Sequence, residues 1–142
     1  MSTWLPDVTP APGESEFDAV FGLRADLFDA YRDFEAVFWS HELLDAAILD
    51  ACRARCAQLL RAAGAASEPV AADDPSSALA ACLIVAEQFV IDPHCVTPEM
   101  REAVIAHVGD AGLVALVEAL AVFDGFTRFR TLLGIAPEAA SA

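Results

Sequence analysis

Hydrophobic residues recur along this chain at the three- and four-residue spacing of amphipathic helices, and the apolar/polar alternation of strands is absent. The spacing predicts two short helices, within residues 17–21 and 25–40, around a bend at Gly22. A third helix is predicted over residues 43–61. Glycine, proline and serine then interrupt the pattern in residues 62–76, which predicts a loop. The fold class is therefore all-α.

The second half of the chain continues the helical pattern. Residues 78–91 are apolar on every side, which is typical of a buried helix, and Asp92-Pro93 ends the helix because the residue before proline avoids the α region. Thr97 is an N-cap for the next helix, which ends near Gly109. A last helix follows and closes before Gly134. We therefore expect about six helices, with short loops that favour antiparallel neighbours.

The length of 142 residues fits one domain. We expect an extended arm over residues 1–14, rich in proline and anchored by Trp4 and Leu5. The helical domain is expected over residues 15–135, and a short tail over residues 136–142.

Composition narrows the classes of partner. Eight arginines and no lysine stand against 22 acidic residues, and the net charge of −14 disfavours nucleic acid and anionic membrane surfaces. The hydrophobic share of 56% is too high for a disordered chain, and no stretch reaches the roughly 18 uncharged apolar residues of a membrane span. The N-terminus lacks the features of a secretory signal, so we expect a soluble, cytoplasmic protein. High apolar content beside strong charge suggests surface buried between subunits of a homo-oligomer.

Four cysteines are present, Cys52, Cys56, Cys82 and Cys95. A chain with this much core does not need a disulfide framework, and free buried thiols are expected. Cys52 and Cys56 share a helix face, but an intact helix does not aim two such side chains at each other. A thiol peroxidase that uses Cys52 or Cys56 is a remote alternative.

Two halves of the sequence carry a family likeness. The segment Asp50-Ala-Cys-Arg-Ala-Arg-Cys-Ala-Gln-Leu59, preceded by Phe21-Gly-Leu-Arg24, has the form of a helix ending in Ala-Gln-Leu. The segment Ala86-Glu-Gln-Phe-Val-Ile-Asp-Pro-His94 is followed by helical stretches at residues 112–120 and 123–129. The chain thereby resembles the carboxymuconolactone decarboxylase and alkylhydroperoxidase D-like superfamily. The resemblance implies an all-α domain of about six helices that oligomerises.

The same resemblance indicates which positions would hold the family's thiol redox centre. Peroxidase members carry Cys-x-x-Cys-x-x-x-His directly after the Ala-Gln-Leu helix, and those positions are Ala62, Ala65 and Pro69 here. The family's proton-relay glutamate falls on Asp50. The resemblance therefore implies a member that has lost the thiol redox centre and acts as a small-ligand-binding or interaction protein.

A cysteine-independent enzyme is the alternative function. Glu87 interrupts an apolar helix, so it is either paired, with Arg128 or another arginine, or desolvated with the raised pKa of many catalytic acids. His94 in the following turn is either a general base or a helix cap. With Asp50, these two residues would move protons on a small unsaturated acid or lactone, as in a decarboxylase or isomerase.

Neither a metal nor a cofactor is expected. His41 and His107 have no ligand partner four residues away. The sequence also has no glycine-rich phosphate loop, no Ser-His-Asp order and no dinucleotide fingerprint.

Overall fold

A computed structural model describes residues 3–40 and 42–136 of the chain. Every regular element in those residues is helical, which confirms the all-α class. His41 and residues 137–142, which make up most of the predicted tail, lie outside the described residues.

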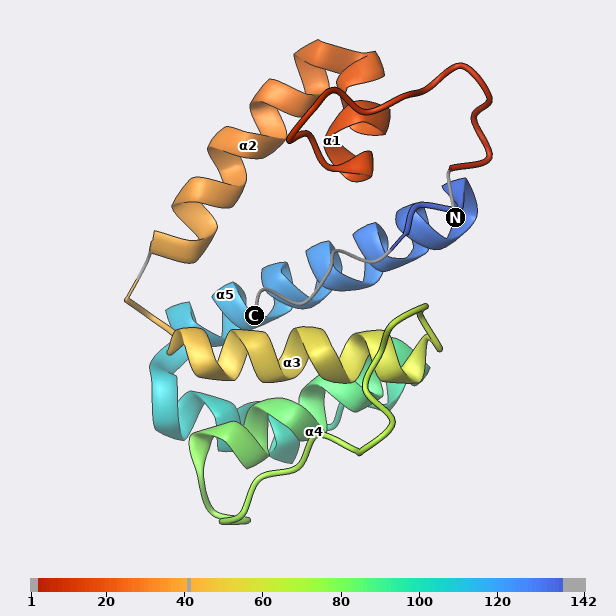
Figure 1. Ribbon diagram of the computed structural model, residues 1–142. Helices are drawn as coiled ribbons and strands as arrows, with labels where there is room; N and C mark the ends of the chain where they lie inside the picture. Colours follow the sequence, from red (N-terminus) through yellow and green to blue (C-terminus); the bar gives the residue numbers. More distant parts are fainter. Residues whose placement is uncertain (1–2, 41, 137–142) are drawn as a thin grey trace. The chain divides into compact units, whose positions relative to one another are not determined.

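The helices begin and end close to the predicted positions. The elements are α1 (Glu16–Phe21), η1 (Gly22–Arg24), α2 (Ala25–Ser40), α3 (Ala46–Leu59), α4 (Ala78–Ile91), η2 (Pro93–Cys95) and α5 (Pro98–Leu133), as drawn in Figure 1. The η elements are single 3-10 turns. The number of α-helices is lower than the expected six, because the last two predicted helices are one element, α5. They meet at Gly109, whose φ of 73° and ψ of 178° kink that helix.

The chain divides into two compact units. Unit 1 comprises residues 1–40 and 128–142, and unit 2 comprises residues 41–127. Helix α5 runs from unit 2 into unit 1. The division into an arm, a helical domain over residues 15–135 and a tail stays a prediction, because compactness alone does not define a folding unit.

Unit 2 is built on the packing of α3 against α4 (Figure 1). The side chain of Asp45 accepts a hydrogen bond from Ala47 N and caps α3, and Ser77 caps α4 by accepting from Ala80 N. The core between the helices is apolar and includes three thiols; its members include Leu49, Cys52, Cys56, Cys82, Val85, Val104, Leu116 and Leu120. The prediction of buried thiols is confirmed for these three cysteines.

One expectation for α4 is wrong. Apolar residues on every side of this helix predicted that all sides are buried, but Ile84 and Ile91 are exposed in the single chain. The side that packs on the rest of unit 2 holds Leu83, Val85 and Ala86.

Unit 1 is held together by aromatic rings. Ring centroids lie 5.2 to 5.9 Å apart in a cluster of edge-on and tilted pairs formed by Phe17, Phe21, Phe28, Tyr31 and Phe129. Such geometries are favourable for aromatic quadrupoles. The cluster ties α1 and α2 to the end of α5.

The N-terminal arm is anchored more firmly than the sequence suggested. The hydroxyl of Thr3 and the amide of Trp4 donate to Leu133 O, at 2.7 and 3.1 Å. The carboxylate of Glu16 accepts from Thr3 N and also from Ala136 N. Trp4 is an anchor as expected, but Thr3 and Glu16 share that role.

By length and composition, α5 is the one helix among the described residues that is long and apolar enough to cross a membrane. The core helix of a soluble protein passes the same test, and Val104, Leu116 and Leu120 of α5 are buried here. The cytoplasmic location and the absence of membrane contact therefore stay predictions.

Candidate functional site

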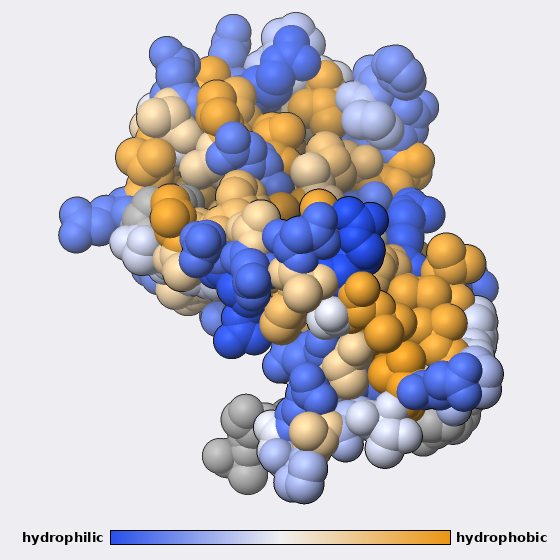
Figure 2. Space-filling view, turned by 90° about the horizontal axis from the view of Figure 1, so that it is seen from above, coloured by the Kyte–Doolittle hydropathy of each residue, from blue (hydrophilic) through white to orange (hydrophobic). Residues whose placement is uncertain are grey.

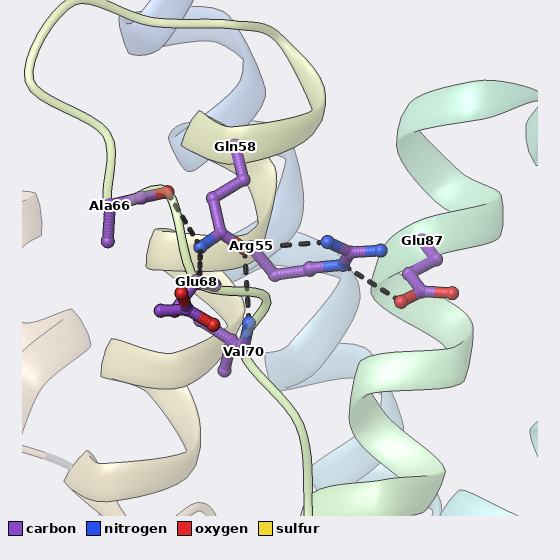
Figure 3. A network of polar contacts seen from close by, with 6 residues as sticks. All are labelled: Arg55, Gln58, Ala66, Glu68, Val70 and Glu87. Atoms are coloured by element: carbon purple, nitrogen blue, oxygen red, sulfur yellow. Dashed lines mark hydrogen bonds and ion pairs between the residues drawn. The ribbon is translucent and has the colours of Figure 1, made fainter.

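Glu87, the acid that interrupts α4, is engaged by an arginine from α3. Arg55 Nε donates to Glu87 Oε1 at 2.8 Å, and the two side chains are 20% and 37% exposed, respectively (Figure 3). Of the two alternatives for Glu87, the structure has the ion pair, and the partner is Arg55 rather than Arg128. The carboxylate is therefore charge-compensated at a half-exposed position.

The position of Arg55 is fixed by a second network around Gln58 (Figure 3). Gln58 Oε1 accepts from Arg55 Nη1 at 3.4 Å and from Val70 N at 3.2 Å. Its Nε2 donates to the carbonyl oxygens of Ala66 and Glu68. One amide side chain thus ties the loop after α3 to the ion pair, and the Gln of the Ala-Gln-Leu motif has a structural role.

The other two candidate catalytic residues lie elsewhere on unit 2. His94 is exposed in η2, and its backbone amide donates to Asp92 Oδ1 at 2.9 Å. Asp50 is exposed on α3, where its carboxylate accepts from Arg53 Nη2 at 2.8 Å. Among the residues that the structure describes, no hydrogen bond or ion pair joins any two of Glu87, His94 and Asp50. The catalytic roles of these three residues therefore stay a prediction.

Burial opposes the ionisation of the three core thiols. Burial raises the pKa of Cys52 far above its ordinary value and raises the pKa of Cys82 to about 11. Burial, together with the negative charge of Asp124, raises the pKa of Cys56 to about 12. Because the thiolate is the nucleophile, these side chains do not attack peroxides readily.

Cys95 differs from the other three cysteines, because it is exposed. Its thiol donates to Asp92 Oδ2 at 3.6 Å, and the charge of that carboxylate raises the pKa of Cys95. The expectation of a buried thiol is wrong for Cys95, although its pKa is raised like those of the three buried cysteines. Electrostatic repulsion from Asp92 has the same effect here.

The positions that would hold the family's redox centre lie between α3 and α4. Ala62, Ala65 and Pro69 occupy them, and none of these side chains is a nucleophile or a base. Across the described residues, no group of three or more His, Cys, Asp and Glu side chains could hold a metal ion.

Unit 1 contains a pocket of about 290 Å³. It is lined by Ser15, Phe17, Asp18, Tyr31, Arg32, Glu35 and Arg130. Its arginines are held by neighbours: Arg32 pairs with Asp18 at 3.4 Å, and the guanidinium of Arg130 lies 4.1 Å from the Phe17 ring centroid. The pocket is large enough for a small organic ligand, but these arginine contacts also explain it as part of the packing of unit 1.

Large apolar side chains are exposed on both units, and Figure 2 shows hydrophobic patches among hydrophilic residues on one face of the molecule. On unit 2 they are Leu43, Ile84, Ile91, Val114 and Val117, and on unit 1 they include Leu23, Leu27, Phe34 and Val37. Ile84, Glu87 and Ile91 follow one side of α4, and we call these three residues the α4 face. The apolar pattern predicted that this side of α4 is covered, and burial between subunits is one way in which Ile84 and Ile91 would leave contact with water.

The chain matches no family model, no curated protein and no solved structure. A functional proposal therefore rests on the geometry of its own residues.

Proposed function

We propose that this chain is a homo-oligomeric helical interaction protein of the alkylhydroperoxidase D-like kind without a thiol redox centre. The observation that carries the proposal is the α4 face. Ile84 and Ile91 are 47% and 65% exposed there, and Glu87, the charged residue between them, is compensated by Arg55. We expect this face to bind the same face of a second copy.

The spacing of the α4 face suits a helix-to-helix contact. Ile84 and Ile91 are seven residues apart, which places both on one side of the helix about 10 Å from each other. Burying an isoleucine side chain that water now contacts is favourable by roughly 1.5 to 3 kcal/mol at most. An isologous interface uses each residue twice, so the gain doubles in a dimer.

Charge compensation makes a second copy an acceptable partner at this face. The net charge of −14 opposes self-association in general. At the α4 face, the guanidinium of Arg55 lies 2.8 Å from the carboxylate of Glu87 and cancels its charge locally. Two copies therefore meet there through apolar side chains without facing like charges.

The state of the core thiols and of Glu87 favours a binding role over a catalytic role. The three core thiols stay protonated at neutral pH, since burial raises their pKa values. Glu87 is held by Arg55, and among the described residues no hydrogen bond or ion pair joins it to His94. An interaction role requires none of these groups to react.

Light scattering coupled to size exclusion tests the proposal. We expect a mass well above the 15.0 kDa of one chain for the native protein and a lower mass for Ile84→Ser/Ile91→Ser. The matched control is Val114→Ser/Val117→Ser, which changes two exposed valines on α5 of the same unit. A native monomer whose mass does not depend on concentration contradicts the proposal, and so does an equal loss of mass in both double variants.

A hydroperoxide assay tests the absence of redox chemistry. We expect no consumption of an organic hydroperoxide with a dithiol reductant, and no change on Cys52→Ser or Cys56→Ser. Consumption that either substitution abolishes would make the peroxidase alternative the better one.

A further inference from the structure

Helix α2 of unit 1 exposes a row of apolar residues. Leu27, Phe34 and Val37 are 48%, 45% and 67% exposed, and Leu23, in the 3-10 turn before the helix, is exposed as well. With the exposed Ala30 they form what we call the α2 stripe. The aromatic cluster occupies a different side of the helix, through Phe28 and Tyr31.

The α2 stripe has the spacing of a coiled-coil seam. Its members Leu23, Leu27, Ala30, Phe34 and Val37 follow one another at intervals of four, three, four and three residues. This is the a/d pattern of a heptad repeat, with a at residues 27 and 34 and d at residues 23, 30 and 37. Such a seam accepts the apolar knobs of another helix along about two heptads.

Aspartates border the stripe on its solvent side. Asp26 and Asp33 occupy the g positions of the heptads, and Asp29 lies beside them at a c position. Arg24 pairs with Asp26 at 3.0 Å. Asp29 and Asp33 make no ion pair with any residue that the structure describes. The border is therefore acidic and mostly uncompensated, unlike the α4 face.

We propose that the α2 stripe binds a cationic amphipathic helix of another protein, with an apolar seam flanked by lysines or arginines. The seam supplies the apolar contact, and the charges of Asp26, Asp29 and Asp33 select the sign of the partner. This goes beyond self-assembly, because it concerns a different unit and a different class of partner.

A second copy is a poor occupant of the stripe. It would bring the same aspartates to the border, where like charges oppose each other, and a further net charge of −14. A cationic helix instead places opposite charges beside Asp29 and Asp33.

The test uses two synthetic helices of about three heptads, each with leucine at a and d. One has lysine at e and g, and the other has glutamate. Fluorescence anisotropy of each labelled peptide is measured against the native protein. We expect the lysine peptide to bind and the glutamate peptide to bind at least about tenfold more weakly.

Variants of the protein locate the binding. Leu27→Ser/Val37→Ser in the seam should weaken the lysine peptide about tenfold or more, and Asp29→Asn/Asp33→Asn at the border should weaken it severalfold. The matched controls, Val114→Ser/Val117→Ser and Glu68→Gln/Asp73→Asn, change exposed valines and acids of unit 2 and should leave binding unchanged. Circular dichroism checks that each variant folds. If Leu27→Ser/Val37→Ser does not fold, the result for Asp29→Asn/Asp33→Asn decides the test.

Three outcomes would overturn the proposal. The first is no binding of the lysine peptide, and the second is an equal loss in the control variants, which indicates general attraction to an acidic protein. The third is a loss of self-association in Leu27→Ser/Val37→Ser, which makes a second copy the occupant of the stripe. The peptide measurement is independent of the α4 test, since dissociation of the oligomer by Ile84→Ser/Ile91→Ser leaves the α2 stripe intact.

Discussion

At the scale of single residues, the ion pair with Arg55 decides whether Glu87 is a candidate catalytic acid. A carboxylate alone in an apolar setting would be a candidate general acid, because desolvation would favour its protonated form. In the structure the carboxylate is not alone, because the guanidinium of Arg55 donates to it at 2.8 Å. Since both side chains keep some contact with water, the pair is worth far less than a fully buried one.

We predict that Glu87→Gln lowers the free energy of unfolding by about 1 kcal/mol or less. The amide keeps the shape of the side chain, and Arg55 keeps its hydrogen bond to Gln58. Urea denaturation at one fixed protein concentration measures the change. The control is Asp50→Asn, which breaks a more exposed pair with Arg53 and should cost less than about 0.5 kcal/mol. A stability gain on Glu87→Gln would instead mark a strained, functional carboxylate.

The core thiols predict a loss of stability at alkaline pH. In the unfolded chain a thiol loses its proton near pH 9, whereas burial raises the pKa of Cys82 to about 11 and that of Cys56 to about 12. Unfolding therefore releases protons above pH 9, and stability present below that pH falls as the pH rises. The expected loss between about pH 8 and pH 10 is roughly 1.4 kcal/mol for each core thiol.

Cys82→Ala should remove about one third of this pH-dependent loss, because three core thiols share it. The measurement is the difference in unfolding free energy between the two pH values, which cancels the cost of the cavity itself. Cys95→Ala, at an exposed position, is the control and should change the loss much less. The absence of lysine keeps other titrations small in this range. A pH-independent stability would contradict the burial of these thiols.

At the scale of elements, local signals predicted most helix boundaries. Thr97 accepts from Met100 N at the start of α5, as an N-cap does. Asp92 follows the last residue of α4, because the residue before proline avoids the α region. The pattern predicts that α3 starts at residue 43, but Asp45 caps the helix and Ala46 begins it three residues later, because an apolar pattern alone does not mark an N-cap.

The contacts of the candidate site could be predicted only in part. The need of Glu87 for an arginine followed from its apolar helix, but the identity of Arg55 depends on how α3 and α4 pack, which no local pattern encodes. The same holds for Ile84 and Ile91. Their exposure follows from which side of α4 faces the core, and a helix apolar all round gives no signal for that choice.

The kink of α5 gives a prediction at this scale. Gly109 has φ 73° and ψ 178°, a region that only glycine visits readily, and a Cβ there would meet nothing within 4 Å. Gly109→Ala should therefore cost about 1 to 3 kcal/mol through backbone strain alone. Gly109→Asn should cost about as much, because asparagine tolerates the left-handed helical region and not this one.

Arg61 is the matched control for the kink. Arg61 lies two residues after the last residue of α3 and has a φ of 53°, and Ala62 N donates to Ala57 O as in a Schellman motif. Arg61→Gly should stabilise the protein by up to about 1 kcal/mol, since glycine adopts that φ without strain. Thermal unfolding of the three variants under one set of conditions measures both effects. If Gly109→Ala were neutral, α5 would not need the kink.

At the scale of the whole molecule, charge separates the two proposed surfaces. All eight basic residues are arginines, and the net charge is −14. Arg55 neutralises the acid of the α4 face, whereas Asp29 and Asp33 beside the α2 stripe have no ion-pair partner among the described residues. An apolar surface of an acidic protein is thus open to a second copy where its charge is cancelled, and to a cationic partner where it is not.

The two surfaces should therefore respond to salt in opposite directions. Raising the ionic strength from about 0.01 M to about 0.15 M shortens the screening length from roughly 30 Å to roughly 8 Å. Screening weakens the repulsion between two copies of net charge −14, so self-association through Ile84 and Ile91 should tighten. The same screening weakens the attraction of Asp29 and Asp33 for lysines, so binding of the cationic peptide should loosen. Sedimentation and anisotropy titrations at the two ionic strengths measure the two dissociation constants. If both moved in the same direction, local charge would not distinguish the α4 face from the α2 stripe, and the choice of partner at one of them would be wrong.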